Sequence, residues 1–361
     1  MDNFREVSIM SRKTVGDAGT ETIDFNVDEP ITALNLIFRV VNGAAVAVNV
    51  PPENCISKIE IVDGGTVYYS LSGPEAMAVA VYESGKWPWA FYNDGANAGQ
   101  KVRIPLYFGR FLGDEEFSFS PSKLLNPQIK VTWAKDALHV TGGVSLGVYA
   151  KLMQGVAPAT KALFTKNIRS FTSAASGIEL TDLPVDRDYR RLFIRDYRPL
   201  GFIMEDVTHY KLDCDTGKLI VLDWDVYELA EHVRDVFGPV ERTSQVCVTN
   251  GTWYEGWLAN ILGAALNSGT AGHIMNAWSA TAGRWEAFIT DAAAGALADE
   301  VATLTLHGCL PHHTFCYQFG RKDDPATWFK ASKYGQVRLE MTQGVANCAI
   351  GLLLQQPRQL P

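Results

Sequence analysis

FGRKDDPATWFKASKYGQVRLEM, residues 319–341, repeats the plan of an earlier stretch, FGRFLGDEEFSFSPSKLLNPQIKVTW, residues 108–133. Each begins with Phe-Gly-Arg, continues through a polar segment that contains proline, and ends in a run that alternates apolar and polar residues. Alternation with a period of two is typical of a β-strand that has one face on a core and the other in solvent. The chain therefore contains an internal repeat, and the repeat is built of strands.

The matching runs keep the same register, and a slip of one residue would turn every core side chain outward. The apolar faces of the two final runs hold Ile129, Val131 and Trp133 in the first, and Val337, Leu339 and Met341 in the second. Two later runs hold Val144, Leu146, Val148, Ala150 and Leu152, and then Cys348, Ile350, Leu352 and Leu354. We expect these side chains to form the cores of two sandwiches.

The repeat extends toward the N-terminus. Residues 22–39 match residues 177–195. In both segments apolar and polar residues alternate, a proline interrupts the pattern, and a second strand follows that is expected to end at Arg39 or at Arg195. These arginines, like Arg110 and Arg321 in the Phe-Gly-Arg repeats, either pair with carboxylates at unit or subunit boundaries or remain solvated at strand ends.

Residues 58–83 and 210–235 each predict a strand, a tight turn, a second strand and a helix. The turns supply the positive φ that a hairpin needs, at Asp63-Gly64-Gly65 and at Asp215-Thr216-Gly217. The helices are expected to be capped by Ser72 and by Asp223, and Pro74 suits a first helical turn.

The spacing between matching residues shows where the two halves differ. Trp224 follows Pro74 by 150 positions, whereas Phe319 follows Phe108 by 211. The additional residues must lie between the second helix and the second Phe-Gly-Arg, at about residues 238–310. The second half therefore carries a long insertion, which a stable sandwich tolerates because the entropy of loop closure grows slowly with length.

Each half has signals for seven or eight short strands around one helix, and neither shows the strand–helix alternation of a parallel sheet. We predict an all-β protein of two tandem antiparallel eight-stranded jelly-roll sandwiches, each with a short central helix. The first, with an N-terminal arm, is expected to cover residues 1–157. The second, with the insertion, is expected to cover residues 158–361, with the joint near Pro158.

The composition is that of a folded protein, with 361 residues of which 47% are hydrophobic and 20% charged. The net charge is −8, and there is no concentrated basic stripe, so we expect no sequence-specific nucleic acid binding. The six cysteines lack paired spacing and are expected to be free, buried thiols of a reducing compartment. The N-terminal residues do not resemble a signal peptide, and no apolar run has the length of a membrane span.

Several motifs invite a functional interpretation, and each has a structural alternative. The insertion holds Trp253, Trp257, Trp278 and Trp285, which could stack on glycans, but we expect them to anchor the insertion on its own unit or on a neighbour. Within the insertion, the segment LANILGAAL, residues 258–266, is expected to form a helix.

The segment HGCLPHHTFC brings together His307, Cys309, His312, His313 and Cys316, which suggests a zinc site. It lacks the two separate Cys pairs of zinc fingers and ribbons, and it matches an ordinary strand of the first half, so we predict no metal there. The Asp-Thr-Gly at Asp215 is interpreted as a hairpin turn rather than as a protease or calcium motif. Asn250 fits a glycosylation sequon, but a turn is the preferred interpretation.

No nucleophile elbow, zinc-protease, P-loop or dinucleotide motif is present, so we predict no catalytic residues, no cofactor and no enzyme activity.

The strand-rich segment of residues 103–133, together with the duplication, the central helices and the insertion, resembles the double jelly-roll major capsid proteins of the adenovirus–tectivirus type. The resemblance covers essentially the whole chain and lies in its architecture rather than in fixed residues. It implies a virion structural protein that forms trimeric, pseudo-hexameric capsomers of an icosahedral shell, with the strands upright and the insertion outside.

The same resemblance implies the partners. These are two further copies in a homotrimer, neighbouring capsomers, vertex or minor capsid proteins, and an internal viral membrane or the genome on the N-terminal side. It also implies a location in the virion after synthesis in the host cytoplasm. Two other hypotheses remain open: a glycan-binding or glycan-hydrolysing protein built on two jelly rolls, and a minor capsid or spike protein.

Overall fold

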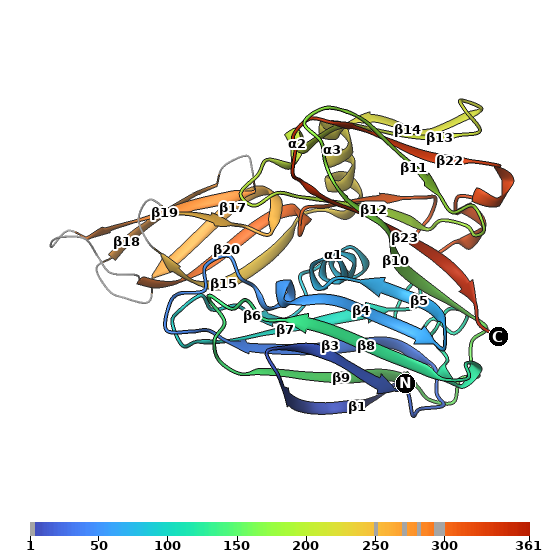
Figure 1. The fold of residues 1–361 in the computed structure, drawn as a ribbon, viewed down its shortest axis with the longest axis horizontal. Coiled ribbons are helices and arrows are strands. Elements are labelled where there is room, and N and C mark those ends of the chain that lie inside the picture. Colours follow the sequence, from blue (N-terminus) through green and yellow to red (C-terminus); the bar gives the residue numbers. More distant parts are fainter. Residues whose placement is uncertain (1–3, 249–251, 269–272, 280–282, 292–299) are drawn as a thin grey trace.

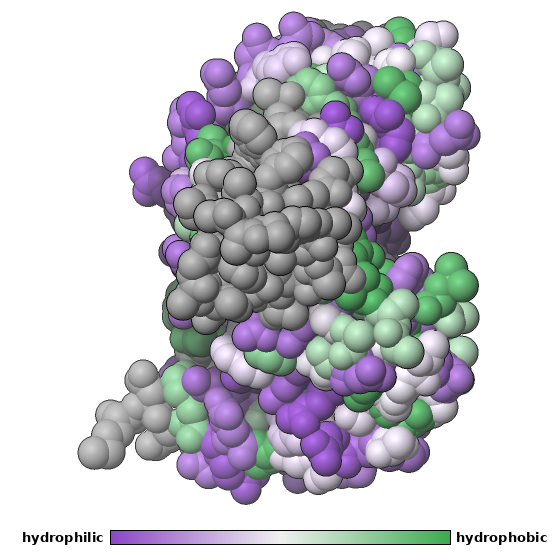
Figure 2. Space-filling model, turned by 90° about the vertical axis from the view of Figure 1, so that its left-hand side faces the viewer, coloured by the Kyte–Doolittle hydropathy of each residue, from purple (hydrophilic) through white to green (hydrophobic). Residues whose placement is uncertain are grey.

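The computed structural model describes residues 4–248, 252–268, 273–279, 283–291 and 300–361. Two β-sandwiches lie one above the other, and a third group of strands projects from one end of the pair (Figure 1). Both chain termini lie toward the other end (Figure 1). Seen from the end of the projecting strands, the two sandwiches form two lobes with a mainly hydrophilic surface (Figure 2).

The first sandwich consists of two antiparallel layers. One layer has the order β1 (Phe4–Val15), β9 (Val144–Met153), β3 (Ile31–Val41), β7 (Gly99–Tyr107) and the short β6 (Ala90–Phe91). The other has the order β2 (Ala18–Asp24), β8 (Pro127–Ala134), β4 (Ile56–Asp63) and β5 (Thr66–Leu71).

The second sandwich repeats this arrangement strand for strand. Its first layer is β10 (Lys161–Thr172), β23 (Ala349–Gln359), β12 (Arg191–Tyr197) and β21 (Thr314–Gln318). Its second layer is β11 (Gly177–Leu183), β22 (Val337–Gln343), β13 (Val207–Cys214) and β14 (Leu219–Asp225). Numbered along each half without β6 and without the insertion strands β15 to β20, the first layer of each sandwich has the order first–eighth–third–sixth and the second layer has the order second–seventh–fourth–fifth. This is the jelly-roll order, so the predicted fold class and duplication are confirmed.

The helices also match between the halves. The first sandwich contains α1 (Gly73–Ser84) and the second contains α3 (Val226–Phe237), each after the fifth strand. Short helices complete the list: α2 (Ile203–Asp206), η1 (Pro52–Cys55), η2 (Pro121–Lys123), η3 (Pro325–Thr327) and η4 (Ala331–Lys333). Ser72 caps α1 as predicted. The predicted cap Asp223 is wrong: β14 continues to Asp225, and Asp225 is the cap of α3.

The Phe-Gly-Arg repeats perform the same task in both sandwiches. In the first, Ile31 and Phe119 exchange backbone hydrogen bonds of 2.7 and 3.0 Å. In the second, Tyr189 and Phe329 exchange bonds of 2.9 and 3.2 Å. Each repeat therefore folds back to the start of the third strand of its sandwich.

The predicted hairpin turns are confirmed, with Gly64 at φ +55° and Asp215 at +50°. Their aspartates have a further role. Asp63 Oδ1 accepts the backbone N–H of Asn126 at 2.6 Å, and Asp215 Oδ1 accepts that of Gln336 at 3.0 Å. Each turn thus binds the loop before the seventh strand of its sandwich, and neither aspartate belongs to a protease or calcium motif.

Strand pairing fixes the register of the repeat. In the second layer of the first sandwich, Ile129 of β8 pairs with Ile23 of β2 on one side and with Ile61 of β4 on the other. At the equivalent place in the second sandwich, Val337 of β22 pairs with Leu183 of β11 and with Cys214 of β13. The core residues predicted from alternation on β8, β9, β22 and β23 are all buried. β23 is buried on both faces, because its outward face is covered by the first sandwich; Leu353 is 0% exposed.

The predicted equivalence of Arg39 and Arg195 is wrong by two residues. Arg195 lies opposite Gly351, and the residue opposite the matching Gly147 is Ile37, not Arg39. Neither arginine ends its strand, because β3 continues to Val41 and β12 to Tyr197. A shift of two residues keeps the same face of the strand, which is why alternation alone did not reveal it.

The projecting strands lie between α3 and β21 in the sequence. One sheet has the order β15 (Val240–Val248), β20 (Glu300–Pro311) and β17 (Leu258–Ser268), and the other β16 (Trp253–Glu255), β19 (Arg284–Asp291) and β18 (His273–Ser279). The helix predicted for residues 258–266 is wrong. This segment is β17, and pairing with β20 satisfies its backbone and overrides the helix propensity of Ala and Leu.

Replacing Val131 with Asp should prevent folding. Val131 is 0% exposed on the central strand β8, and a carboxylate there costs several kcal/mol against a total stability of about 5–15 kcal/mol. Thr132→Asp is the matched control, because Thr132 lies on the solvent face of the same strand and bonds to Thr20. Circular dichroism and thermal melting check the result. A soluble Val131→Asp chain with a normal melting transition would contradict the strand assignment.

Candidate assembly interface

Helix α1 lies between the two sandwiches (Figure 1). Every residue from Gly73 to Tyr82 is buried, whereas α3 buries only Val226, Leu229, Ala230 and Val233. The first sandwich covers one side of α1, and the outer face of the layer that contains β12, β21 and β23 covers the other. Local sequence explains the helix: Glu75 accepts the backbone N–H of the cap Ser72 at 2.7 Å, and Gly85 ends the helix with φ +69°.

A buried ionic network joins α1 to the second sandwich. The carboxylate of Glu83 receives Arg190 Nη2 at 3.2 Å, Arg191 Nη1 at 3.0 Å and Gln355 Nε2 at 2.9 Å. Glu83 and both arginines are at most 5% exposed in their side chains. Burial by itself would raise the pKa of Glu83, but the two guanidinium groups outweigh it and lower that pKa to about 2. The carboxylate is therefore ionised and fully paired inside the joint.

Further bonds cross the same joint. Tyr82 OH donates to the carbonyl of Thr314, and Lys322 Nζ donates to the carbonyl of Glu83 at 3.2 Å. Arg110 Nη1 donates across the joint to the carbonyl of Asp323 at 3.2 Å. The two sandwiches are thus held by directional bonds as well as by apolar contact, and this fixes their relative orientation.

A second buried cluster lies where both sandwiches meet the projecting strands. Glu53 of η1 lies 3.2 Å from His312 Nε2 and accepts Tyr92 OH at 2.9 Å. Arg242 of β15 lies over the Tyr92 ring at 4.1 Å. Burial would raise the pKa of Glu53, but His312 and Arg242 lower it, while burial lowers the pKa of His312. One carboxylate thus links residues from all three parts of the molecule.

A third cluster clamps the insertion to the second sandwich. Glu255 of β16 accepts the backbone N–H of Leu200 and lies 3.6 Å from His313 Nε2. Trp257 stacks on Tyr197 at 6.0 Å. Burial raises the pKa of Glu255 to about 7, and burial lowers the pKa of His313 to about 3. The pair is therefore uncharged over much of the acidic range.

The insertion also contacts the first sandwich. Asn93 Nδ2 donates to Gln245 Oε1 of β15 at 2.8 Å, and the two residues form an isolated bridge. The base of the insertion is therefore held by both sandwiches.

The tryptophans of the insertion mostly serve as predicted anchors. Trp257 is 3% exposed, and Trp285 is 1% exposed and stacks on Tyr254 at 4.4 Å. Trp253 is half-buried beneath the guanidinium of Arg284. The side chain of Trp278 lies outside the described part of the structure. The buried rings of Trp257 and Trp285 offer no platform for a sugar, so these two residues do not support the glycan hypothesis.

The five residues of the suggested zinc site do not converge on one point. His312 lies against Glu53 and His313 against Glu255, while the exposed His307 is on β20. Cys309 and Cys316 are buried on successive strands. The segment is also not one ordinary strand as predicted: β20 ends at Pro311, the chain turns through His312 and His313 at positive φ, and β21 begins.

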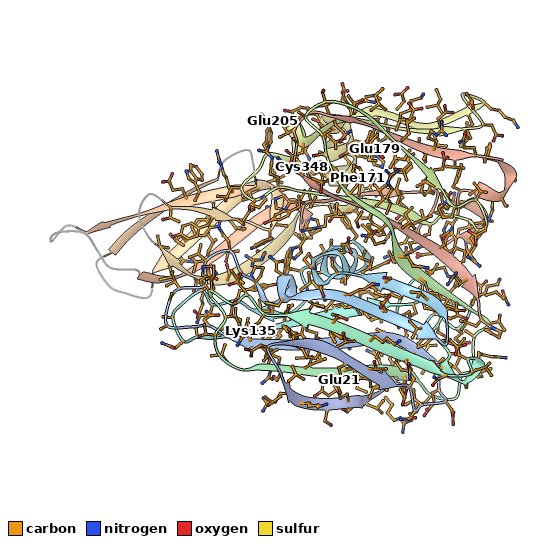
Figure 3. The ribbon with its side chains drawn as sticks, in the orientation of Figure 1. Glu21, Lys135, Phe171, Glu179, Glu205 and Cys348 are labelled. Carbon is orange, nitrogen blue, oxygen red and sulfur yellow. The ribbon has the colours of Figure 1, made fainter. Side chains whose placement is uncertain are left out.

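Within the described residues, one other group could hold a metal ion. The donor atoms of Asp196, Asp206 and Cys348 lie within 4.8 Å of one another, and all three residues are buried. Figure 3 shows Cys348 in the second sandwich, near the end that carries the insertion. Asp206 pairs with Arg198 at 2.8 Å, and burial raises the pKa of Asp196 well above its usual value. A protonated Asp196 beside a neutralised Asp206 explains this cluster without an ion.

The remaining predicted residues have separate environments. Arg110 pairs with Asp114 at 2.6 Å and with Glu116 at 2.9 Å. The guanidinium of Arg195 lies over the ring of Tyr197, 4.9 Å from its centroid. Burial lowers the pKa of Arg195, and the negative charge of Glu75 partly offsets this effect. The other two arginines, Arg39 and Arg321, make no ion pair with a residue that the structure describes. Asn250 lies outside the described residues.

The sequence analysis assigned no site residues, and it missed the carboxylates Glu53, Glu83 and Glu255. One signal for the joint is visible in retrospect. Arg190 and Arg191 stand together just before the apolar run Leu192–Ile194 of β12, where two adjacent cations need a buried partner. No comparable signal marks the partner on α1.

No protein-family model matches the chain, and no curated protein matches it in sequence. Solved structures do match. The STIV MCP has a TM-score of 0.64 and 12% identity, covering 99% of this chain and 97% of that one. The crystal structure of PBCV-1 VP54, which was fitted into a cryo-EM reconstruction of the virophage Sputnik, has a TM-score of 0.61 and 9% identity, covering 99% of this chain and 94% of that one. The major capsid protein P2 of bacteriophage PM2 has a TM-score of 0.54 and 10% identity, covering 99% of this chain and 98% of that one.

This chain has the fold of those capsid proteins. The match extends over both sandwiches and the insertion, since nearly the whole of each chain is covered. At identities near 10% the likeness lies in the fold. Among the described residues, no helix is long and apolar enough to cross a membrane.

Replacing Glu83 with Gln should weaken the joint and remove one source of acid sensitivity. Loss of the carboxylate leaves Arg190 and Arg191 buried without a counter-charge, which costs about 3–5 kcal/mol at pH 7. In the unaltered chain, the lowered pKa of Glu83 contributes about 3 kcal/mol to the free energy of unfolding above pH 4.5. This contribution is lost as the pH falls from 4.5 toward 2. Urea titrations at several pH values measure both effects. An unchanged unfolding free energy at pH 7 would show that the network is not stabilising.

Replacing Glu255 with Gln should change the pH dependence in the opposite sense. Because the pKa of Glu255 is about 7 in the folded chain and 4.5 in the unfolded chain, Glu255 ionises at lower pH when the chain is unfolded. The free energy of unfolding therefore falls as the pH rises from 4.5 to about 7. Burial raises the pKa of Asp94 to about 7 as well, so Glu255→Gln should flatten the decline without abolishing it. Exposed Glu241→Gln is the control. Equal slopes for Glu255→Gln and the control would contradict this assignment.

Proposed function

We propose that this protein is a major capsid protein whose trimers form the pseudo-hexameric capsomers of an icosahedral viral shell. The observation that carries the proposal is the double jelly roll itself. One chain contains two sandwiches of identical strand order, packed side by side, with strands along the same long axis and an insertion at one end (Figure 1). The fold is shared over nearly the whole chain with proteins named as major capsid proteins.

The geometry suits a hexagonal lattice. Three copies supply six similar wedges, and contacts between two different surfaces of successive copies give a closed ring when the rotation between copies closes. We divide the chain at residues 157 and 158, between β9 and β10, so that each wedge is one jelly roll. Three of the six wedges, the second sandwich of each copy, then carry the insertion.

The same geometry supports an orientation in the shell. The insertion and the termini lie at opposite ends of the long axis, so we place the insertion outside and the termini inside. On that placement the partners are the other copies of the trimer, neighbouring capsomers, vertex or minor capsid proteins, and an internal membrane or genome on the N-terminal side. The protein would be made in the host cytoplasm, reside in the virion and have no catalytic role.

The mass of the purified chain in solution tests the proposal. Size-exclusion chromatography with light scattering should give three times the chain mass of 39.7 kDa, because the wedge of each sandwich needs a neighbour on both sides. Electron micrographs of concentrated samples should show sheets or shells. A chain that stays monomeric over the full concentration range would contradict the proposal.

A further inference from the structure

The first sandwich presents a basic face that nothing in the described chain covers. The outward side of the layer of β9, β3 and β7 carries Arg39, Lys101, Arg103 and Lys151, and Arg12 of β1 lies beside them. None of these five cations has an ion pair with a described carboxylate. Burial lowers the pKa of Lys101, and the charges of Arg39, Arg103 and Arg12 lower it further. An anionic partner would therefore relieve the mutual repulsion of these cations.

The basic face contains a groove of about 630 Å³. Apolar side chains form part of its lining, and Trp89 is 57% and Phe91 42% exposed. Lys101 Nζ lies 4.6 Å from the centroid of the Trp89 ring, and exposed aromatic rings beside cations without a carboxylate partner are typical of a surface that another protein covers.

The equivalent face of the second sandwich is covered within the chain. Strand pairing places Gly351 where the first sandwich has Gly147, so the outer face of β12 and β23 corresponds to the basic face of β3 and β9. There α1 of the first sandwich supplies acids to arginines: Glu83 pairs with Arg191, and Glu75 faces Arg195. The chain therefore already contains one copy of an acidic helix docked on a basic sheet.

Helix α3 is the counterpart of α1, but its second face is free. Measured from the caps Ser72 and Asp225, Glu228 of α3 occupies the position of Glu75 in α1, whereas Val236 stands at the position of Glu83. The side of α3 that corresponds to the docked side of α1 exposes Glu228, Glu231 and Asp235. None of these three acids pairs with a cation in the described part of the chain. Glu205 of the neighbouring α2 is also exposed (Figure 3).

We propose that α3 of one copy docks on the basic face of β3, β7 and β9 of the next copy, on the face equivalent to the one that α1 covers within the chain but with charged residues at other positions. The acids of α3 neutralise the cations of the groove, and the exposed Tyr227 and Val236 supply apolar contact to Trp89 and Phe91. Like charges on two faces that must meet cost several kcal/mol, so the match of sign is selective for this pairing. The inference rests on the proposed function and names the surfaces that close the trimer.

The test reverses charges on either side of this contact. Glu231→Lys with Asp235→Lys makes the helix basic, and Arg12→Glu with Lys101→Glu makes the sheet acidic. Each pair should weaken self-association about 100-fold, so that light scattering at micromolar concentration reports monomers. A chain with all four changes should form trimers again, because the changed residues then carry opposite charges across the contact once more. Asp28→Lys with Glu115→Lys, two exposed acids away from both faces, is the matched control and should remain trimeric.

The outcomes separate this inference from the proposed function. If the unaltered chain forms trimers and both reversed pairs still do, the docking inference is wrong while the capsid proposal stands, and the groove is free for an anionic ligand from outside the trimer. If the reversed pairs are monomeric and the fourfold variant does not recover, charge matching between these two faces is refuted. If the unaltered chain never associates, the capsid proposal itself fails. Circular dichroism of each variant shows that folding is retained.

Discussion

The architecture depends on one helix that is buried on both sides. α1 belongs to the first sandwich through its cap and its small side chains, and it belongs equally to the second sandwich through Glu83. A buried carboxylate between two guanidinium groups tolerates little displacement, because any opening leaves charges without partners. The ionic network therefore holds the two sandwiches at one angle, and in the proposed capsomer that angle would set how successive copies meet.

Duplication explains why the two halves are similar, and the differences explain what each half does. The matching aspartates Asp63 and Asp215 retain the same backbone contacts, since those contacts belong to the fold. The helices have diverged: α1 is buried throughout, whereas α3 keeps an acidic exposed face. The insertion rests on buried clusters around Glu53 and Glu255, so its base is fixed to both sandwiches.

The strands, turns and core faces could be predicted because period-two alternation and positive-φ turns are local properties. The helix at residues 258–266 was wrong, because pairing with β20 is a long-range contact that composition does not encode. The two-residue error at Arg39 arose because a shift of two preserves the face. The pairing in the buried clusters could not be predicted, since Glu83 meets Arg190 across 107 positions of sequence and nothing near Glu83 indicates the two arginines.

The central claim is that two jelly rolls in one chain act as neighbouring wedges of a closed ring. A cryo-electron microscopy map of the purified oligomer, viewed along its symmetry axis, tests this most directly. The account predicts six barrels of similar outline around the axis, with three projections on one face and the chain termini on the other. A ring in which the two sandwiches of each chain point in different directions, or an oligomer without threefold symmetry, would contradict it.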